Sequence, residues 1–214
     1  ILNPRTCVAF TGHRTYRDEA RELLLPTLEA LYERGFRTFL SGMAVGFDLA
    51  AAVLLLRQRH AEVRLVAVVP FRHQAARFPA AQRLRYERIL AAADSIEVLS
   101  EEYHRGCYAR RNDFLVAHAQ VVVAWYDGLP EGGTYYTVER ARTRLREVIN
   151  LHPAAPFHLL ALRRNSLTGP ASLIGPASLI GPASLTGPAS LTGPTSLTGP
   201  ASPLPSLPAL TAPS

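Results

Sequence analysis

Short apolar runs alternate with longer segments along the first 150 residues or so of the chain. The apolar runs predict strands at 6–10, 36–41, 63–69, 95–99, 120–125 and 148–151, and 157–162 extends the last. The segments between them have helical length and repeat apolar residues at helical spacing, which predicts helices at about 17–34, 46–60, 80–93, 106–119 and 134–146. This alternation is typical of βαβ units. The predicted fold class is therefore α/β, a single Rossmann-like doubly wound domain with a mostly parallel sheet.

Two of the predicted helices have unusual residues. The segment 46–60 is rich in alanine and leucine and is apolar nearly all round, which predicts a well-buried helix. Pro26 lies within the segment 17–34, where it either opens a short helix or kinks a longer one. Gly35 follows as a stop signal.

The composition changes at about residue 164. All 23 basic and all 17 acidic residues precede residue 165, and a Ser-Leu-Thr-Gly-Pro-Ala hexapeptide then repeats six times, with small exchanges, from 166 to 201. A left-handed β-helix also uses hexads, but these would make only about two turns and each contains a proline. We therefore expect a Rossmann-like domain at 1–160 and a disordered low-complexity tail at 161–214.

The net charge of +6 comes entirely from arginines, since the chain has no lysine. The arginines are scattered among acidic residues and form no basic cluster, so nucleic acid is not expected as a partner. The sequence has neither a signal peptide nor a long apolar stretch, which predicts a cytoplasmic protein without a membrane partner. Because residue 1 is isoleucine, the natural start can lie upstream.

Two cysteines give no disulfide framework, and Cys7 is expected to be a core thiol. His104 and Cys107 have the spacing of a metal-binding pair, but a second pair is missing, so we predict no metal site.

In a parallel sheet, ligands bind beyond the carboxyl ends of the strands. The loops expected there are 11–16, 41–47, 70–79, 100–106 and 126–133. The strongest candidate is the segment Ser41 to Asp48, in which a small-residue loop leads into a helix whose unpaired N–H groups and dipole suit a phosphate. Gly42 and Gly46 would allow close approach of a ligand, or would merely make a tight turn. Asp48 would cap the helix or bind a ribose hydroxyl.

The first strand ends in a similar way, with Thr11, Gly12, His13 and Arg14. Arg14 can bind phosphate or carboxylate oxygens with its forked guanidinium; alternatively, this is a surface turn whose charges face water.

Further candidates come from later segments. Gly132, Gly133 and Thr134 form a third small-residue approach to a helix, and Trp125 would stack on a base or bound the core. On the helix at 106–119, Arg111 would clamp phosphate and Asn112 would bind a base edge or a loop carbonyl. Both side chains cannot face one ligand equally, because adjacent helical residues point about 100° apart.

Catalysis on an N-glycosidic bond requires a carboxylate. Glu131 and Glu139 are the nearest candidates, although single glutamates near a helix start are usually caps or solvated. The catalytic assignment is therefore weak.

Five ordered motifs together resemble the YpsA-like branch of the SLOG superfamily. They are TGHR at 11–14, SGMAVGFD at 41–48, VPF at 69–71, GCYARRND at 106–113 and GGT at 132–134. The superfamily includes the DNA-processing protein DprA and the LOG-type phosphoribohydrolases. The resemblance implies a Rossmann-like domain that binds a nucleotide or a nucleotide-derived ligand such as NAD or ADP-ribose.

The resemblance does not extend to every family activity. LOG enzymes carry P-G-G-x-G-T followed closely by glutamates, whereas this chain has PEGGT at 130–134 and its next acid is Glu139. The chain also lacks an obvious accessory DNA-binding domain. We therefore expect ligand binding in a sensor or regulatory role that acts on a protein partner. The alternative is a nucleotide N-glycosidase of the phosphoribohydrolase type.

Overall fold

The computed structural model describes residues 2–159, which all belong to one compact unit. The strands are β1 Cys7–Gly12, β2 Thr38–Ser41, β3 Arg64–Val69, β4 Ser95–Val98, β5 Val121–Trp125, β6 Glu147–Asn150 and β7 Phe157–Leu159. The helices are α1 Arg21–Glu33, α2 Phe47–Gln58, α3 Ala80–Ala92, α4 Cys107–His118 and α5 Gly132–Thr143, with short 3₁₀ turns η1 at Pro4–Thr6 and η2 at Gln74–Arg77. The predicted tail and the 160/161 domain boundary lie outside the described residues.

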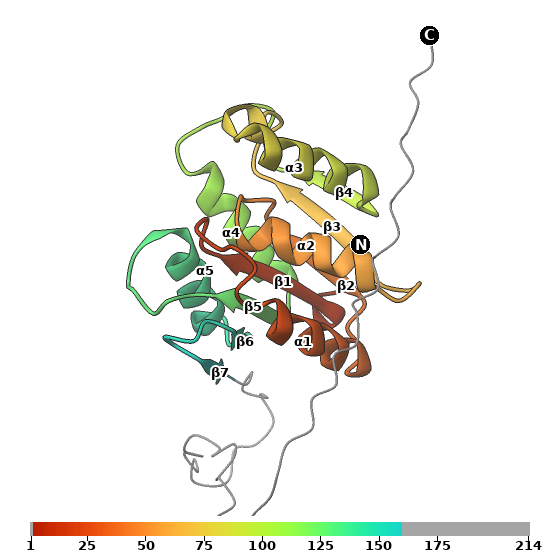
Figure 1. Cartoon of the computed structure of the whole chain (residues 1–214). Coiled ribbons are helices and arrows are strands. Elements are labelled where there is room, and N and C mark those ends of the chain that lie inside the picture. The colour runs from red at the N-terminus through yellow and green to blue at the C-terminus, as the bar shows by residue number, and fades with distance from the viewer. Residues whose placement is uncertain (1, 160–214) are drawn as a thin grey trace, which may run out of the picture. The chain divides into compact units, whose positions relative to one another are not determined.

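All seven strands form one sheet in the order β4-β3-β2-β1-β5-β6-β7 (Figure 1). The first six strands in this order run parallel to one another. Only β7 runs antiparallel, against β6. The strand order reverses between β1 and β5. This confirms the predicted doubly wound α/β fold and places the loops after β1 to β5 at one edge of the sheet.

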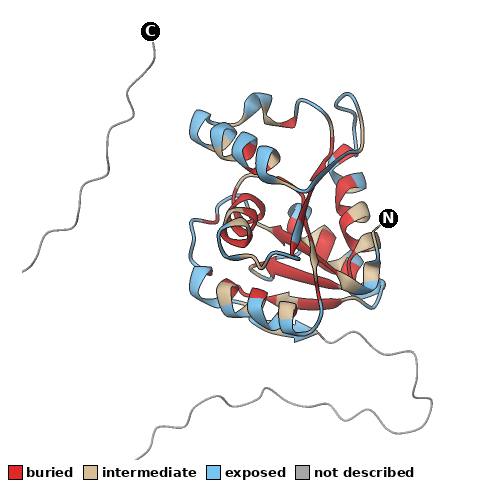
Figure 2. Cartoon of the chain, turned by 90° about the vertical axis from the view of Figure 1, so that its right-hand side faces the viewer, coloured by how far each residue is buried: buried red, intermediate tan, exposed pale blue. Residues whose placement is uncertain are grey.

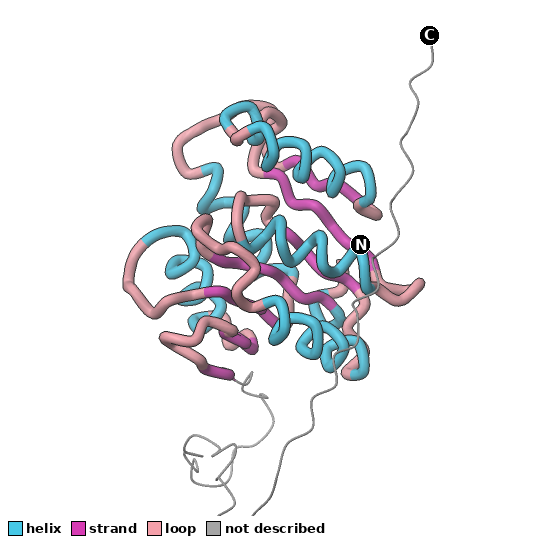
Figure 3. The backbone as a smooth tube through the Cα atoms, in the orientation of Figure 1, coloured by secondary structure: helices cyan, strands magenta, loops and turns pink. Residues whose placement is uncertain are grey.

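Helices cover both faces of the sheet (Figures 1 and 3). Helices α1, α2 and α3 share a core with Phe10, Phe39 and other residues of one face, whereas α4 and α5 pack on the other face around Leu40 and Val122. The central strands are therefore buried on both sides, while the outer faces of most helices are exposed (Figure 2). Cys7 is fully buried in the second cluster, as expected for a core thiol.

Helix α1 differs from its predicted bounds, and strand β4 lacks the burial of the central strands. Helix α1 begins at Arg21 instead of residue 17, because Asp18 has a positive φ of 70° and the Arg17 amide donates to Glu19. The helix then continues through Pro26. Strand β4 is exposed along its whole length, since it is an edge strand and α3 packs on α2.

Among residues 2–159, no helix combines the length and the apolar character needed to cross a bilayer.

Two glycines precede helices with positive φ, but only one is tightly packed. A Cβ at Gly46 (φ 94°, ψ −127°) would lie 2.3 Å from the His13 carbonyl oxygen and 2.7 Å from the Arg14 Cα. At Gly106 (φ 91°, ψ −3°), a Cβ would meet nothing within 4 Å among the described residues. These two positions provide a matched pair for substitution.

We predict that Gly46→Ala lowers the free energy of unfolding by about 3 kcal/mol or more, because the clash is with backbone atoms and the conformation is restricted to glycine. The control Gly106→Ala should cost only about 1–2 kcal/mol, the cost of left-handed backbone alone. Urea unfolding measures both values. Equal losses would show that the packing around Gly46 is not constraining.

Candidate functional site

A cleft of about 570 Å³ lies at the carboxyl edge of the sheet, and we call it the edge cleft. It is formed by the loops after β1, β2, β3 and β4 together with the first turns of α4. The lining residues are Arg14, Ala44, Val45, Phe71, His73, Gln74, Ala76, Arg77, Phe78, Tyr103, Tyr108 and Arg111. Of the predicted site residues, the fold therefore brings Arg14 and Arg111 together here, with part of the loop after β2.

The innermost cation of the edge cleft is the buried guanidinium of Arg111. Its Nη1 donates to the Gly42 carbonyl and lies 3.8 Å from Asp48 Oδ2, while its Nε donates to Asn112 Oδ1 at 2.7 Å. Asn112 in turn donates to the Gly133 carbonyl at 3.2 Å. These bonds connect the start of α4 to the loop after β2 and to the start of α5.

Asp48 lies in the first turn of α2 and is buried beside Arg111. Its Oδ2 accepts a hydrogen bond from the Ala44 amide at 3.4 Å. Burial raises the pKa of Asp48 to about 6, although the neighbouring Arg111 guanidinium acts in the opposite direction. The Asp48 carboxyl group therefore forms a hydrogen bond with the loop after β2.

The loop after β2 uses several of its polar groups internally. Ser41 is fully buried, and its hydroxyl accepts from the Met43 amide and donates to the Asp48 carbonyl. The Phe47 amide donates to the His13 carbonyl. Within residues 2–159, no acceptor is found for the Val45 amide, and Val45 lines the edge cleft. In the predicted phosphate site, the Met43 and Phe47 amides are thus already hydrogen-bonded within the protein, whereas the Val45 amide remains available.

The glycines of this loop make close contacts within the protein. A Cβ at Gly42 would lie 2.3 Å from the Arg111 guanidinium, and Gly46 packs against the loop after β1. Gly12 leaves similar room, since a Cβ there would lie 2.4 Å from the Phe47 side chain. These contacts explain all three glycines without a ligand.

Side chains of the loop after β1 lie in two different places: His13 lies beside the loop after β5, and Arg14 lies in the edge cleft. Thr11 is buried in β1, and the His13 ring lies 3.1 Å from the Asp127 carboxylate in the loop after β5. Arg14 is exposed and lies in the edge cleft, with its guanidinium carbon 5.9 Å from the centre of the Tyr108 ring.

The aromatic residues of the edge cleft were not among the predicted site residues. Phe71 packs edge to face against Tyr103 and Tyr108, at 5.5 Å and 5.9 Å between ring centres. Tyr103 is 65% exposed and Tyr108 is 37% exposed. The loops of Phe71 and Tyr103 were predicted to lie at this edge, and Phe71 and Tyr108 belong to two of the resembling motifs, but nothing in the local pattern brings these rings together.

Gln74 was also missed. It lies in η2 and lines the edge cleft, and its Nε2 donates to the Met43 carbonyl. Its Oε1 is buried and has no hydrogen-bond partner among the described residues. This oxygen is an acceptor to which no group of residues 2–159 donates.

The remaining candidates lie outside the edge cleft. Trp125 is buried against Tyr16 and His152, and Gly132, Gly133 and Thr134 begin α5 on the other side of Arg111 and Asn112. Glu131 is exposed and makes no side-chain cap, and Glu139 pairs with Arg142 at 3.1 Å.

His104 is exposed and Cys107 is buried at the start of α4. In the described part of the chain, no three His, Cys, Asp or Glu side chains gather closely enough to hold a metal ion.

Comparison with known proteins identifies the family. Residues 9–152 match the profile of the YspA SLOG family. The chain belongs to this family. The resemblance found in its motifs is therefore confirmed.

Two curated proteins are similar to this chain in sequence. The SPbeta prophage-derived protein YoqJ of Bacillus subtilis is 29% identical over 156 residues, which cover 65% of this chain and 91% of YoqJ. A UPF0398 protein of Halalkalibacterium halodurans is 31% identical over 122 residues, covering 55% of this chain and 65% of that protein.

Solved structures of DprA share the fold. The DNA processing protein A of Streptococcus pneumoniae has a TM-score of 0.50 at 22% identity, with 66% of this chain covered. This chain spans only 48% of that protein. The Helicobacter pylori protein, described by its single-stranded DNA binding mode, has a TM-score of 0.49 at 19% identity, over 68% of this chain and 64% of its own.

The expectation that nucleic acid is not a partner is wrong, because this chain has the fold of a DNA processing protein. That expectation rested on the absence of a basic cluster in the sequence. The fold, however, brings Arg14, Arg77 and Arg111 into one cleft from three distant segments. Scattered arginines are therefore no argument against a cationic site in this SLOG domain.

We predict that Asp48→Asn changes the pH dependence of stability. Because the pKa of Asp48 is raised from 3.8 to about 6 on folding, its contribution is fully present below pH 3.8 and is lost as pH rises through 6. Asparagine mimics the protonated form. The stability of the unmodified protein relative to the variant should fall by about 2–3 kcal/mol between pH 4 and pH 7, the equivalent of a two-unit shift.

Urea unfolding at several pH values measures this difference, and comparison with the variant cancels the titration of other groups. Parallel stability curves would mean that Asp48 keeps its ordinary pKa in the folded protein.

Proposed function

We propose that the edge cleft binds a nucleotide or a nucleotide-derived ligand such as NAD or ADP-ribose, in a regulatory role. The observation that carries this proposal is the combination of three arginines and a cluster of aromatic rings in one cleft at the carboxyl edge of the sheet. Its volume of about 570 Å³ falls in the range of small-molecule sites.

The phosphate groups of the ligand would bind on the side of Arg14 and the loop after β2. Arg14 makes no ion pair within residues 2–159, so its guanidinium is available to fork onto phosphate oxygens. The Val45 amide adds a donor near the positive end of the α2 dipole. Arg77 adds a second exposed cation.

The base would stack on the aromatic cluster formed by Phe71, Tyr103 and Tyr108. A base that covers these exposed rings displaces no protein contact from them. Stacking also tolerates different bases. The unpartnered Oε1 of Gln74 would accept a hydrogen bond from a ribose hydroxyl or an exocyclic amino group. Together these groups match the parts of a nucleotide.

The geometry favours binding over hydrolysis of an N-glycosidic bond. Among the described residues that line the edge cleft, none carries a carboxylate, and both Glu131 and Glu139 lie elsewhere. The carboxylate that hydrolysis through Glu131 or Glu139 would require is therefore missing from the lining, which favours a protein that retains its ligand. Ligand occupancy would then be passed to a protein partner.

Single-stranded nucleic acid is a second candidate ligand. Exposed aromatic rings beside arginines also suit successive bases and phosphates, and DprA of Helicobacter pylori is described as binding single-stranded DNA. Both candidates would use the same residues, so the distinction depends on ligand length.

We expect Arg14→Ala to weaken binding of ADP-ribose, measured by titration calorimetry, about 10- to 100-fold, since a charged hydrogen bond contributes about 1.5–3 kcal/mol. Tyr108→Ala should weaken it about 5- to 150-fold, because stacking contributes about 1–3 kcal/mol per base. Adenosine, which has no phosphate, should be insensitive to Arg14→Ala.

Arg17→Ala is the matched control, because Arg17 is an exposed arginine three residues from Arg14 that does not line the edge cleft. Unchanged ADP-ribose affinity in both cleft variants would refute the nucleotide site. If only an oligodeoxythymidine binds, and both variants weaken it, single-stranded DNA is the ligand.

A further inference from the structure

Helix α2 has apolar residues on its outer face as well as its inner face. Its sequence, FDLAAAVLLLRQ, contains a polar residue only at Asp48, which is buried, and at the last two positions. A helix that is apolar all round is normally enclosed by other elements. Val53 and Leu56, however, remain half-buried on the side away from the sheet.

These outer residues form the floor of a groove between α1 and α3, which we call the helix groove. It has a volume of about 500 Å³, and its apolar lining includes Leu24 from α1, Val53 and Leu54 from α2, and Leu84 and Ile89 from α3. Leu84 is 48% exposed. Figure 1 shows α2 between α1 and α3, the two helices whose residues line the sides of the groove.

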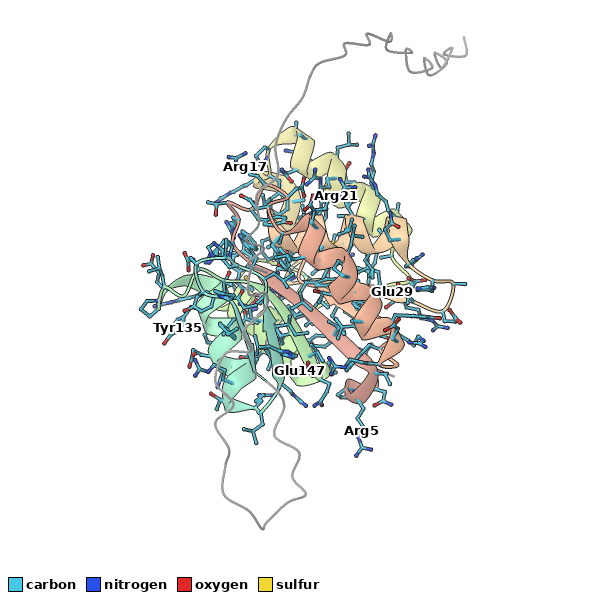
Figure 4. The ribbon with its side chains drawn as sticks, turned by 60° about the horizontal axis from the view of Figure 1, so that its bottom comes forward. Arg5, Arg17, Arg21, Glu29, Tyr135 and Glu147 are labelled. Carbon is cyan, nitrogen blue, oxygen red and sulfur yellow. The ribbon has the colours of Figure 1, made fainter. Side chains whose placement is uncertain are left out.

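Four arginines surround this apolar floor. They are Arg21 at the start of α1, which Figure 4 shows beside α3, Arg57 at the end of α2, and Arg85 and Arg88 on α3. The only acidic residue of the lining is Asp18.

The four groove arginines have no carboxylate partner in the described part of the chain. Within residues 2–159 none of them makes an ion pair, whereas Arg34, Arg59, Arg72, Arg140 and Arg142 elsewhere on the domain all do. The helix groove therefore combines an apolar floor with four arginines that no carboxylate of the described residues neutralises.

We propose that the helix groove binds an acidic amphipathic helix of a partner protein. The apolar face of such a helix would cover Val53, Leu54 and Leu84, and its carboxylates would pair with the arginines of the rim. The groove lies between two roughly parallel walls, α1 and α3, which is the arrangement that accepts a third helix over α2.

Charge and polarity select this occupant over the alternatives. Nucleic acid matches the arginines, but its phosphates do not cover an apolar floor. Residues 165–214 of this chain are apolar in part but have no charged side chain, so they would leave the arginines unpaired. A second copy of the chain carries a net charge of +6 and would bring like charges together.

The helix groove and the edge cleft share no lining residue. The two sites therefore fail or succeed independently in an experiment. Arg85 and Arg88 line the helix groove and do not line the edge cleft, so exchanging their charges tests the groove without touching the ligand site.

The test uses the full chain and a fluorescein-labelled helical peptide with leucine on one face and glutamate on the other, measured by fluorescence anisotropy. We expect saturable binding that weakens with added NaCl and falls at least tenfold in Arg85→Glu/Arg88→Glu. Arg144→Glu, a charge exchange at an exposed arginine after α5, should leave the affinity unchanged. Circular dichroism confirms that each variant is folded.

Equal binding of a peptide with lysine in place of glutamate would overturn the proposal, as would an affinity indifferent to the Arg85→Glu/Arg88→Glu change. Displacement of the peptide by an oligonucleotide, with the same dependence on these arginines, would assign the groove to nucleic acid. With a benzophenone side chain replacing Leu84, the photo-crosslink should form to the peptide. A crosslink to residues 165–214, or to a second copy, would also reject the proposal.

Discussion

The insertion of a buried guanidinium between three segments organises the carboxyl edge of this domain. Transfer of an arginine out of water has a large free-energy cost unless its donors are satisfied. Arg111 meets this requirement with the Gly42 carbonyl, with Asn112 and with the nearby carboxyl of Asp48. The start of α4, the loop after β2 and the first turn of α2 are therefore held in one arrangement.

The contacts of Arg111 also distinguish the charged groups of the edge cleft that are used within the protein from those that are available to a ligand. Arg111 and Asp48 satisfy each other and the loop, whereas Arg14 extends into the cleft from a loop whose backbone is fixed by contact with Gly46. A rigid base beneath an exposed cation reduces the ordering cost of binding an anion. The glycines at 12, 42 and 46 thus contribute to the site by allowing this packing.

The sequence pattern predicted most of the fold because each buried strand and each helix has its own local periodicity. It placed the start of α1 four residues too early, since Asp18 adopts a positive φ that no repeat of leucines reveals. It identified Arg14 and Arg111 from motifs at strand and helix ends. It missed the rings of Phe71, Tyr103 and Tyr108, because their meeting depends on the pairing of β3 with β4 and on two loop conformations.

The reversed direction of β7 has a practical consequence for how the domain is handled. Leu159 pairs with Val148, near the amino end of β6, so the described chain leaves the sheet at the edge opposite the loops that form the cleft. A tether or affinity handle joined at this position would begin on the far side of the domain. Immobilisation through it would leave the ligand entrance facing solution.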